Sequence, residues 1–174
     1  AKQFAKVNKI KNVKFIKASV LKLPFENNSF DFVFCKGVLH HTGNLYKGLS
    51  EIKRVLKKES YAFIYLYGSG GIFWDTRKWM RNVISKIPID YTIKVLRDIG
   101  MPSRRTIFVD SWYVPIEDHV NKENLEKWFK KNNFLFKKYQ NAKKTELEFR
   151  ENKDKFFNEM YGSGELRYRI KKIK

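Results

Sequence analysis

The sequence contains a single cysteine in 174 residues, so it has no pair to form an internal disulfide. One thiol suits the reducing cytoplasm, and we therefore expect a cytoplasmic protein. Long hydrophobic runs are also absent: none approaches the roughly 20 residues that cross a membrane, so we expect no membrane span. The three histidines have no acidic cluster at ligand spacing, which predicts no metal site.

Acidic residues are scarce beside basic ones, 18 against 37, which leaves a net charge of +19. One interpretation is a positively charged surface that binds nucleic acid. The other is a biased composition, because lysine is spread over the whole chain and only 167–174 is dense in charge. The alternation in that last segment also fits an edge strand, where lysines discourage aggregation. Both interpretations stay open at this point.

Hydrophobic residues make up 43% of the chain and aromatic residues 16%, which predicts a folded protein. No internal repeat and no linker divides residues 1–174, so we expect one domain. Hydrophobic periodicity predicts strands that alternate with helices, which is the order found in a parallel α/β sheet. The predicted strands are 13–17, 30–35, 61–67, 134–140 and 166–173, and the predicted helices are 2–11, 44–57, 122–132 and 142–161.

Local signals refine this pattern. Asn44 and Asn121 are placed to cap helices, and Asn133 to end one in a left-handed conformation. Residues 57–60 read as a turn before the third strand, and 101–120 as an irregular segment that contains two prolines.

Gly68-Ser69-Gly70-Gly71 interrupts the alternation of strands and helices. A phosphate-binding loop would need a third glycine where Phe73 stands, so we interpret the segment as a flexible hinge. Two apolar stripes at helical spacing follow it, and such stripes are usually core. We expect a helical insertion at about 72–100 that forms a lid over the strand ends, and a second, polar helical insertion at about 142–162.

The most informative stretch runs from Leu23 to Thr42, with the sequence LPFENNSFDFVFCKGVLHHT. Leu-Pro-Phe fixes an extended turn, a polar turn follows, and an apolar strand then ends in cysteine, lysine, glycine and two histidines. This run resembles the central part of class I S-adenosylmethionine-dependent methyltransferases, of the type 11-like, bacterial kind. The resemblance covers residues 1–67 well and 110–141 more loosely.

The resemblance implies a Rossmann-like α/β sheet, mostly parallel with an antiparallel last strand, and S-adenosylmethionine as cofactor. The family's glycine-rich loop follows its first strand, and the acid that holds the ribose ends its second. Nothing in residues 1–11 resembles either feature. We therefore expect an N-terminally truncated domain without its first two strands, inactive when expressed alone.

Cofactor contacts follow from the same resemblance. Just past the strand at 13–17, the family usually has Asp and a small residue, which bind the adenine through the acid and a backbone N–H. Ser19 replaces the acid here, and Val20 still offers its N–H. Cys35, Lys36 and Gly37 match the edge that touches the methionine portion. The alternatives are an ordinary loop at Ser19, a small buried hydrophobe at Cys35 and a close backbone approach at Gly37.

Acid–base candidates follow the strand directly. Imidazole titrates near neutrality, so His41 is the candidate catalytic base and His40 a candidate substrate contact; local packing is the alternative for both. The segment Asp110–Pro115 resembles one near the family's acceptor pocket, where Asp110 and Tyr113 would orient a substrate. The alternative is a loop anchored by its aromatic side chains.

Two functional hypotheses result. The first is methyl transfer from S-adenosylmethionine to a small-molecule or glycan-type acceptor, with no choice among nitrogen, oxygen and carbon and no prediction of oligomeric state. The second is a basic RNA-binding or RNA-methylating protein of the same fold, which the charge favours and the cofactor-edge residues disfavour.

Overall fold

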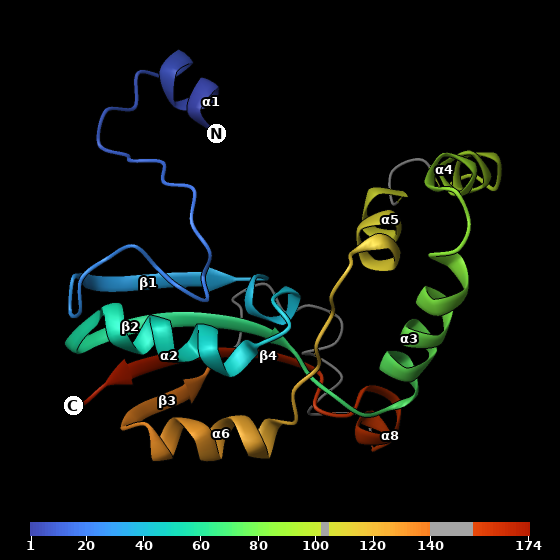
Figure 1. The fold of residues 1–174 in the computed structure, drawn as a ribbon. Coiled ribbons are helices and arrows are strands. Elements are labelled where there is room, and N and C mark those ends of the chain that lie inside the picture. The colour runs from blue at the N-terminus through green and yellow to red at the C-terminus, as the bar shows by residue number, and fades with distance from the viewer. Residues whose placement is uncertain (102–104, 140–154) are drawn as a thin grey trace.

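The computed structural model describes residues 1–101, 105–139 and 155–174 (Figure 1). In chain order its elements are α1 (Lys2–Val7), β1 (Phe30–Lys36), the 3₁₀ helix η1 (Leu39–His41), α2 (Leu45–Val55), β2 (Leu56–Tyr67), α3 (Ile72–Ile84), α4 (Ile89–Asp98), α5 (Arg105–Tyr113), α6 (Lys122–Lys131), β3 (Phe134–Lys138), α8 (Phe157–Tyr161) and β4 (Glu165–Lys172).

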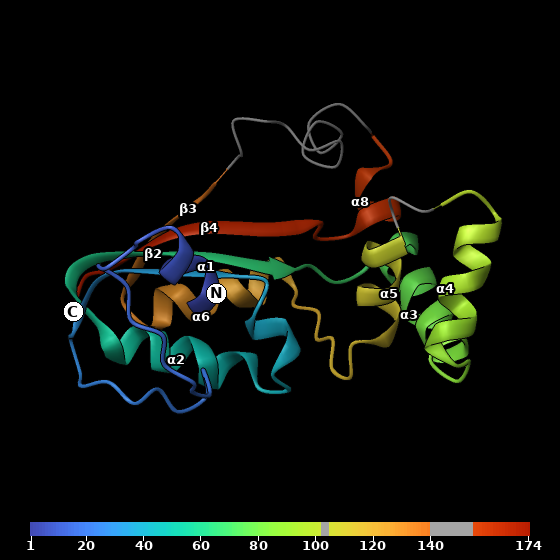
Figure 2. The same cartoon turned by 90° about the horizontal axis from the view of Figure 1, so that it is seen from above.

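The described strands form one sheet in the order β1-β2-β4-β3. β1 runs parallel to β2, while β4 is antiparallel to both β2 and β3. Three strands therefore share a direction and the last one opposes them, which confirms the predicted mixed α/β sheet. Helices α2 and α6 cover one face, and α3, α4, α5 and α8 lie beyond the carboxyl ends of β1 and β2 (Figures 1 and 2).

The core lies between the sheet and helices α2 and α6. Alternate residues of the two central strands point into it: Ala62, Ile64 and Leu66 from β2 and Leu166, Tyr168 and Ile170 from β4 are at most 1% exposed. Leu49 and Ile52 of α2 and Leu125 and Phe129 of α6 meet them from the helices. Each large apolar side chain contributes about 1.5–3 kcal/mol when it leaves water. This core holds the strand ends in place.

The predicted helix caps are confirmed. The Asn44 side chain accepts a hydrogen bond from the Lys47 N–H at 3.1 Å, and the Asn121 side chain accepts one from the Asn124 N–H at 3.1 Å. Asn133 has a φ of 59°, so it does take the left-handed conformation after α6.

The prediction of a strand at 13–17 is wrong. These residues form no helix or strand, and Val13, Phe15 and Ile16 are 42–47% exposed. A strand needs a neighbour for its N–H and C=O groups, and no described segment pairs with this one. The outer edge of β1 is open in the same way, because β1 pairs only with β2 among the described strands.

The turn predicted at 57–60 is also wrong, because β2 begins at Leu56. Phe30 faces Leu56 and Phe32 faces Tyr61, so five steps along β2 match two along β1 and three extra residues bulge out. Glu59 takes a left-handed φ of 62° within this bulge. The polar residues that looked like a turn are thus accommodated inside the strand.

Two further predictions need correction. β4 lies between β2 and β3, so the basic C-terminal segment is an interior strand and not an edge strand. The segment expected to be irregular contains α5, whose start and end lie between Pro102 and Pro115. Of the helix predicted at 142–161, residues 142–154 lie outside the described residues and the end coincides with α8.

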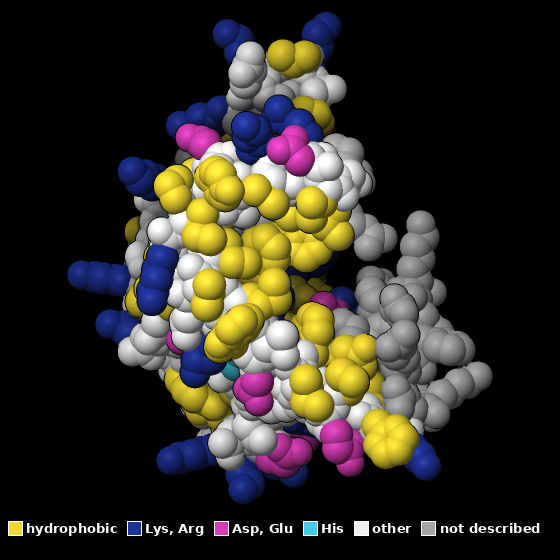
Figure 3. All heavy atoms as spheres, turned by 90° about the vertical axis from the view of Figure 1, so that its right-hand side faces the viewer, with side chains coloured by type: hydrophobic (Ala, Val, Ile, Leu, Met, Phe, Trp, Pro, Cys, Tyr) yellow, Lys and Arg dark blue, Asp and Glu magenta, His cyan; other side chains and the backbone are white. Residues whose placement is uncertain are grey.

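Most residues in the apolar stripes of α3 and α4 are not core. Trp79, Tyr91 and Ile99 are 66%, 62% and 63% exposed, whereas Trp74 and Leu96 are buried. Figure 3 faces this end of the molecule and shows the apolar side chains gathered there. Each helix carries apolar residues on two faces, and the periodicity alone did not reveal which face packs inward.

The sheet face away from α2 and α6 is aromatic and basic. Phe32 and Phe34 of β1 are 54% and 63% exposed, and the Phe34 ring stacks on Phe63 with centroids 5.1 Å apart. On the neighbouring strands the Arg167 guanidinium lies 5.0 Å from the Tyr65 ring centre. A cavity of about 420 Å³ runs over this face.

Candidate functional site

The carboxyl end of β1 leads directly into η1. Gly37 has a φ of 71°, a left-handed conformation that glycine adopts without strain, and it turns the chain there. Asp118 N–H then donates to the His40 carbonyl at 2.7 Å, and Val120 N–H donates to the Tyr67 carbonyl at 3.1 Å. Residues 116–120 therefore run beside η1 and the end of β2, and they bring all three histidines into one cluster.

His40 is completely buried in this cluster. Its ring stacks on Tyr67, with centroids 3.9 Å apart and planes 21° apart, and neither ring nitrogen has a hydrogen-bond partner in the described structure. Burial, assisted by the nearby His41, lowers the pKa of His40 to about 4. The ring is therefore neutral at physiological pH, and the geometry favours the packing interpretation over contact with a substrate.

Glu117 lies between Arg77 and His119. Its carboxylate accepts from the Arg77 guanidinium at 2.8 Å and contacts His119 Nε2 at 3.1 Å, while His119 Nδ1 lies 2.8 Å from the Gly68 carbonyl. Both ring nitrogens of His119 thus lie within hydrogen-bond distance of an oxygen atom. Burial raises the pKa of Glu117, but the His119 hydrogen bond and the Arg77 charge outweigh it, and the net pKa is lowered.

His41 is the half-buried member of the cluster. Its Nδ1 lies 2.7 Å from the Ile116 carbonyl oxygen, so Nδ1 carries the proton that it donates there. In the neutral form of the ring the lone pair is then on Nε2, which has no hydrogen-bond partner among the described residues. A ring held at one nitrogen with the other available is the arrangement of a general base. The catalytic role predicted for His41 is chemically feasible in this position.

Val20 and Cys35 line a cavity of about 330 Å³ that runs along β1, together with Val38. The other cofactor-edge residues, Ser19, Lys36 and Gly37, do not line it, and Lys36 lines the cavity over the sheet face instead. Val20 N–H donates to no acceptor among the described residues. Ser19 Oγ is exposed and accepts from the Leu21 N–H at 3.2 Å. Cys35 is buried, and burial raises its pKa to about 11, so it behaves as a small hydrophobe and not as a thiolate. Lys36 is exposed at the same strand end.

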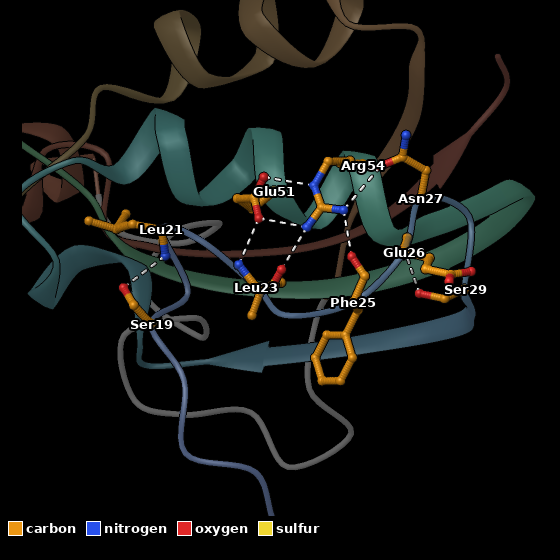
Figure 4. Close-up of polar contacts among 9 residues, drawn as sticks. All are labelled: Ser19, Leu21, Leu23, Phe25, Glu26, Asn27, Ser29, Glu51 and Arg54. Carbon is orange, nitrogen blue, oxygen red and sulfur yellow. Dashed lines mark hydrogen bonds and ion pairs between the residues drawn. The ribbon is translucent and has the colours of Figure 1, made fainter.

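Arg54 of α2 holds the Leu23–Asn27 loop (Figure 4), and Leu23 and Phe25 of this loop line the cavity. Its guanidinium donates to the Leu23 and Phe25 carbonyl oxygens at 2.9 and 2.7 Å and to the Asn27 side chain at 3.0 Å. Glu51 completes the contact: it accepts from Arg54 and from the Leu23 N–H at 2.7 Å. The Arg54 hydrogen bond lowers the pKa of Glu51 to about 2. The loop is therefore fixed by a charged pair on the neighbouring helix.

The two glycine-rich segments pack against each other. Gly68 N–H donates to the Gly164 carbonyl at 2.8 Å, and Ser163 N–H donates to the Ser69 carbonyl at 2.9 Å. A Cβ added to Gly71 would lie 2.4 Å from the Gly162 nitrogen, so no side chain fits there. The segment interpreted as a hinge is thus one side of a close backbone contact at the base of α3.

Asp110 and Tyr113 lie on α5 and not in a loop. Asp110 is exposed. Tyr113 donates its hydroxyl to the Ile87 carbonyl at 2.8 Å and lies 2.7 Å from Thr92 Oγ1, so it joins α5 to α4 and its preceding turn. The structure does not bring either residue to the histidine cluster.

Sequence reasoning did not single out Arg77, Glu117 or His119. The signal available was weak: a glutamate and a histidine two positions apart, between Pro115 and a helix cap. Among the described residues no three His, Cys, Asp or Glu side chains gather closely enough to hold a metal ion. None of the described helices has the length and apolar character of a membrane span.

Comparison with known proteins agrees with the fold. Residues 1–64 match the family model described as a methyltransferase domain. The solved structure of YcgJ from Bacillus subtilis superimposes with a TM-score of 0.58 and 14% identity, over 99% of this chain and 76% of that one. The chain has the class I methyltransferase fold.

Two curated proteins are similar in sequence to parts of this chain. The uncharacterized methyltransferase YcgJ of Bacillus subtilis is 36% identical over 59 residues, 34% of this chain and 23% of the relative. The uncharacterized protein MJ0638 of Methanocaldococcus jannaschii is 49% identical over 96 residues, 55% of this chain and 40% of the relative. The chain therefore spans less than half the length of these two curated relatives.

Proposed function

We propose that this protein transfers a methyl group from S-adenosylmethionine to a small-molecule or glycan-type acceptor. The observation that supports it most is at the carboxyl end of β1. There Val20 and Cys35 line one end of an apolar cavity that runs along the strand, and η1 beside it carries an imidazole with a free nitrogen. In open α/β sheets, ligands bind at this end of the strands. The single buried thiol is consistent with the cytoplasmic location that we also propose.

The residues around the carboxyl end of β1 suit S-adenosylmethionine. An apolar cavity accommodates a flat base, and the unused Val20 N–H and the Ser19 hydroxyl are groups that would bind the adenine. Gly37 would let the backbone approach the methionine portion closely. When bound, S-adenosylmethionine supplies an electrophilic methyl carbon, which bonds to the acceptor's lone pair while sulfur keeps the electrons of the broken bond.

The protein's own contribution is positioning and proton transfer. The Ile116 carbonyl orients His41, so that Nε2 takes the proton released by a hydroxyl or amine acceptor. Helices α3 and α4, the proposed lid, would exclude water above the strand ends. Most of the rate enhancement of such a displacement comes from holding the reacting atoms in line.

A methyl-transfer screen tests this proposal. The full-length protein is incubated with methyl-labelled cofactor and either a metabolite extract or RNA, and incorporated label is measured. Label in the metabolite fraction is expected. Absence of both label transfer and cofactor binding in the full-length protein would end the proposal.

A second candidate function is RNA binding, with or without RNA methylation. The observation that favours it is the exposed sheet face, where Phe32 and Phe34 of β1 line the same cavity as two arginines of β4, across the intervening strand β2. Exposed aromatic rings on a sheet, flanked by arginines, are typical of surfaces on which unpaired bases stack. Filter binding at two salt concentrations separates the candidates, because phosphate contacts make the affinity fall steeply with salt. A weak or salt-insensitive signal excludes this candidate.

A further inference from the structure

A second cavity, separate from the one at the cofactor edge, lies among the helices beyond the strand ends. It measures about 450 Å³ and is lined by residues of α3, α5 and α8. This volume is within the range of about 300–1,000 Å³ that small-molecule sites occupy. Figure 3 shows the hollow on this side of the molecule, with apolar side chains around it.

The walls of this cavity are apolar. Ile72, Phe73 and Met80 come from α3, Phe108 and Trp112 from α5, and Met160 from α8. The polar side chains among the described lining residues are Thr76, Ser111, the Tyr161 hydroxyl and Arg77, and none of these carries negative charge. A ligand that fills the cavity therefore needs an apolar body, and its charged group, if it has one, must be an acid.

Arg77 is placed to meet that acid. One of its terminal nitrogens bonds Glu117 at 2.8 Å, while its buried Nε has no acceptor among the described residues. Because Nε is shielded, a ligand in the cavity would reach the guanidinium through the other terminal nitrogen, which has no hydrogen-bond partner among the described residues. The guanidinium also lies 4.9 Å from the Tyr67 ring centre, and Tyr67 stacks on His40. Arg77 thus links the cavity to the histidine cluster.

We propose that the cavity lined by α3, α5 and α8 binds the methyl acceptor, and that the acceptor is an amphipathic acid. Its apolar body fills the cavity and its anionic oxygen, carboxylate or phosphate, bonds Arg77. This inference rests on the proposed methyl transfer for the word acceptor, but the ligand class follows from the cavity alone. A cationic ligand is disfavoured, since no described lining residue would balance its charge.

Calorimetry with four probes of one chain length tests the ligand class: octanoate, octyl phosphate, octanol and octylamine, titrated into the full-length protein without cofactor. Octanoate or octyl phosphate is expected to bind at least tenfold more tightly than octanol, because a charge-assisted hydrogen bond contributes that much. The tighter of the two acids identifies the headgroup. Octylamine is expected to bind most weakly.

Arg77→Met keeps the apolar stem and removes the charge. It is expected to abolish the preference for the acid while changing octanol affinity less than threefold, and Arg77→Lys is expected to restore part of the preference. Arg81→Met on the same helix is the matched control, because Arg81 donates to the Val114 carbonyl and does not line the cavity.

Three results would overturn the inference: equal binding of octylamine and the acids, no saturable binding of any probe, or an acid preference that survives in Arg77→Met. The outcome is distinguishable from failure of the proposed function. A protein that binds the acids but takes no S-adenosylmethionine refutes methyl transfer and leaves the cavity assignment standing. A protein that methylates an extract but binds no acid refutes only the ligand class.

Discussion

Replacing His40 by phenylalanine should remove much of the protein's sensitivity to acid. The native ring is buried, has no hydrogen-bond partner at either nitrogen among the described residues, and has its pKa lowered to about 4. The unfolded chain binds a proton on this histidine near pH 6.5, as free histidine does. Between these two values the unfolded state binds more protons than the native state, so stability falls as the pH is lowered.

The magnitude follows from the two pKa values. Above pH 7 the titration of His40 changes the free energy of unfolding very little. At lower pH it reduces this free energy, by about 2 kcal/mol at pH 5 and about 3 kcal/mol at pH 4. The groups that face the ring are His41, His119, Arg77 and Glu117; the first three lower its pKa and Glu117 raises it. A phenylalanine ring can stack on Tyr67 without a proton to gain, so at pH 7 we expect a stability within about 1 kcal/mol of wild type.

Urea unfolding of wild type and His40→Phe at pH 7, 6 and 5 measures this effect. The quantity of interest is the difference between the two proteins, since other titrating groups cancel in it. We expect the variant to gain about 2 kcal/mol on wild type between pH 7 and pH 5. His41→Phe, a change at the neighbouring half-buried histidine, is the control and should leave most of the His40 contribution in place, because burial is the largest cause of the lowered His40 pKa. A His40→Phe difference that stays constant with pH would refute the reasoning.

Four further predictions concern stability, the cofactor edge and the reaction. Lys172→Met should lower the free energy of unfolding in urea by about 2–3 kcal/mol. The buried ammonium donates to the Asn28 side chain and to two carbonyl oxygens at 2.7–2.9 Å, and these acceptors lose their partner in the variant. An unchanged urea midpoint would contradict this. Ser19→Asp should tighten S-adenosylmethionine binding in calorimetry by supplying a charged acceptor, and weaker binding would mean that Ser19 does not face the adenine. His41→Ala should lower kcat far more than cofactor affinity, and wild-type turnover with several acceptors would make the residue structural. Residues 1–174 expressed alone should bind the cofactor weakly and tend to associate through the open edge of β1, and micromolar binding by a monomeric sample would contradict this.

The sheet and its helices were predictable because their signals are local. The Leu23–Thr42 run, the caps at Asn44 and Asn121 and the left-handed Asn133 each depend on residues near one another in sequence, and all lie where expected. The strand at 13–17 failed for a non-local reason: its apolar residues have the right pattern, but no described strand pairs with them.

The site was predictable only in part. The strand-end rule placed His40 and His41 correctly at the end of β1, yet no local pattern indicated that one would be buried and the other hydrogen-bonded at Nδ1. Arg77 and His119 join the same cluster from distant segments through Glu117. Such contacts depend on how the helices beyond the strand ends pack, which periodicity does not encode when, as on α3, both helix faces are apolar.

The central claim is that S-adenosylmethionine binds at the carboxyl end of β1. Hydrogen exchange of the full-length protein, read peptide by peptide with and without the cofactor, tests this claim most directly. Saturating cofactor should slow exchange in residues 18–22 and 35–42 and leave α6, at 122–131 on the far side of the core, unchanged. No saturable protection, or protection confined to segments away from these two, would contradict the account.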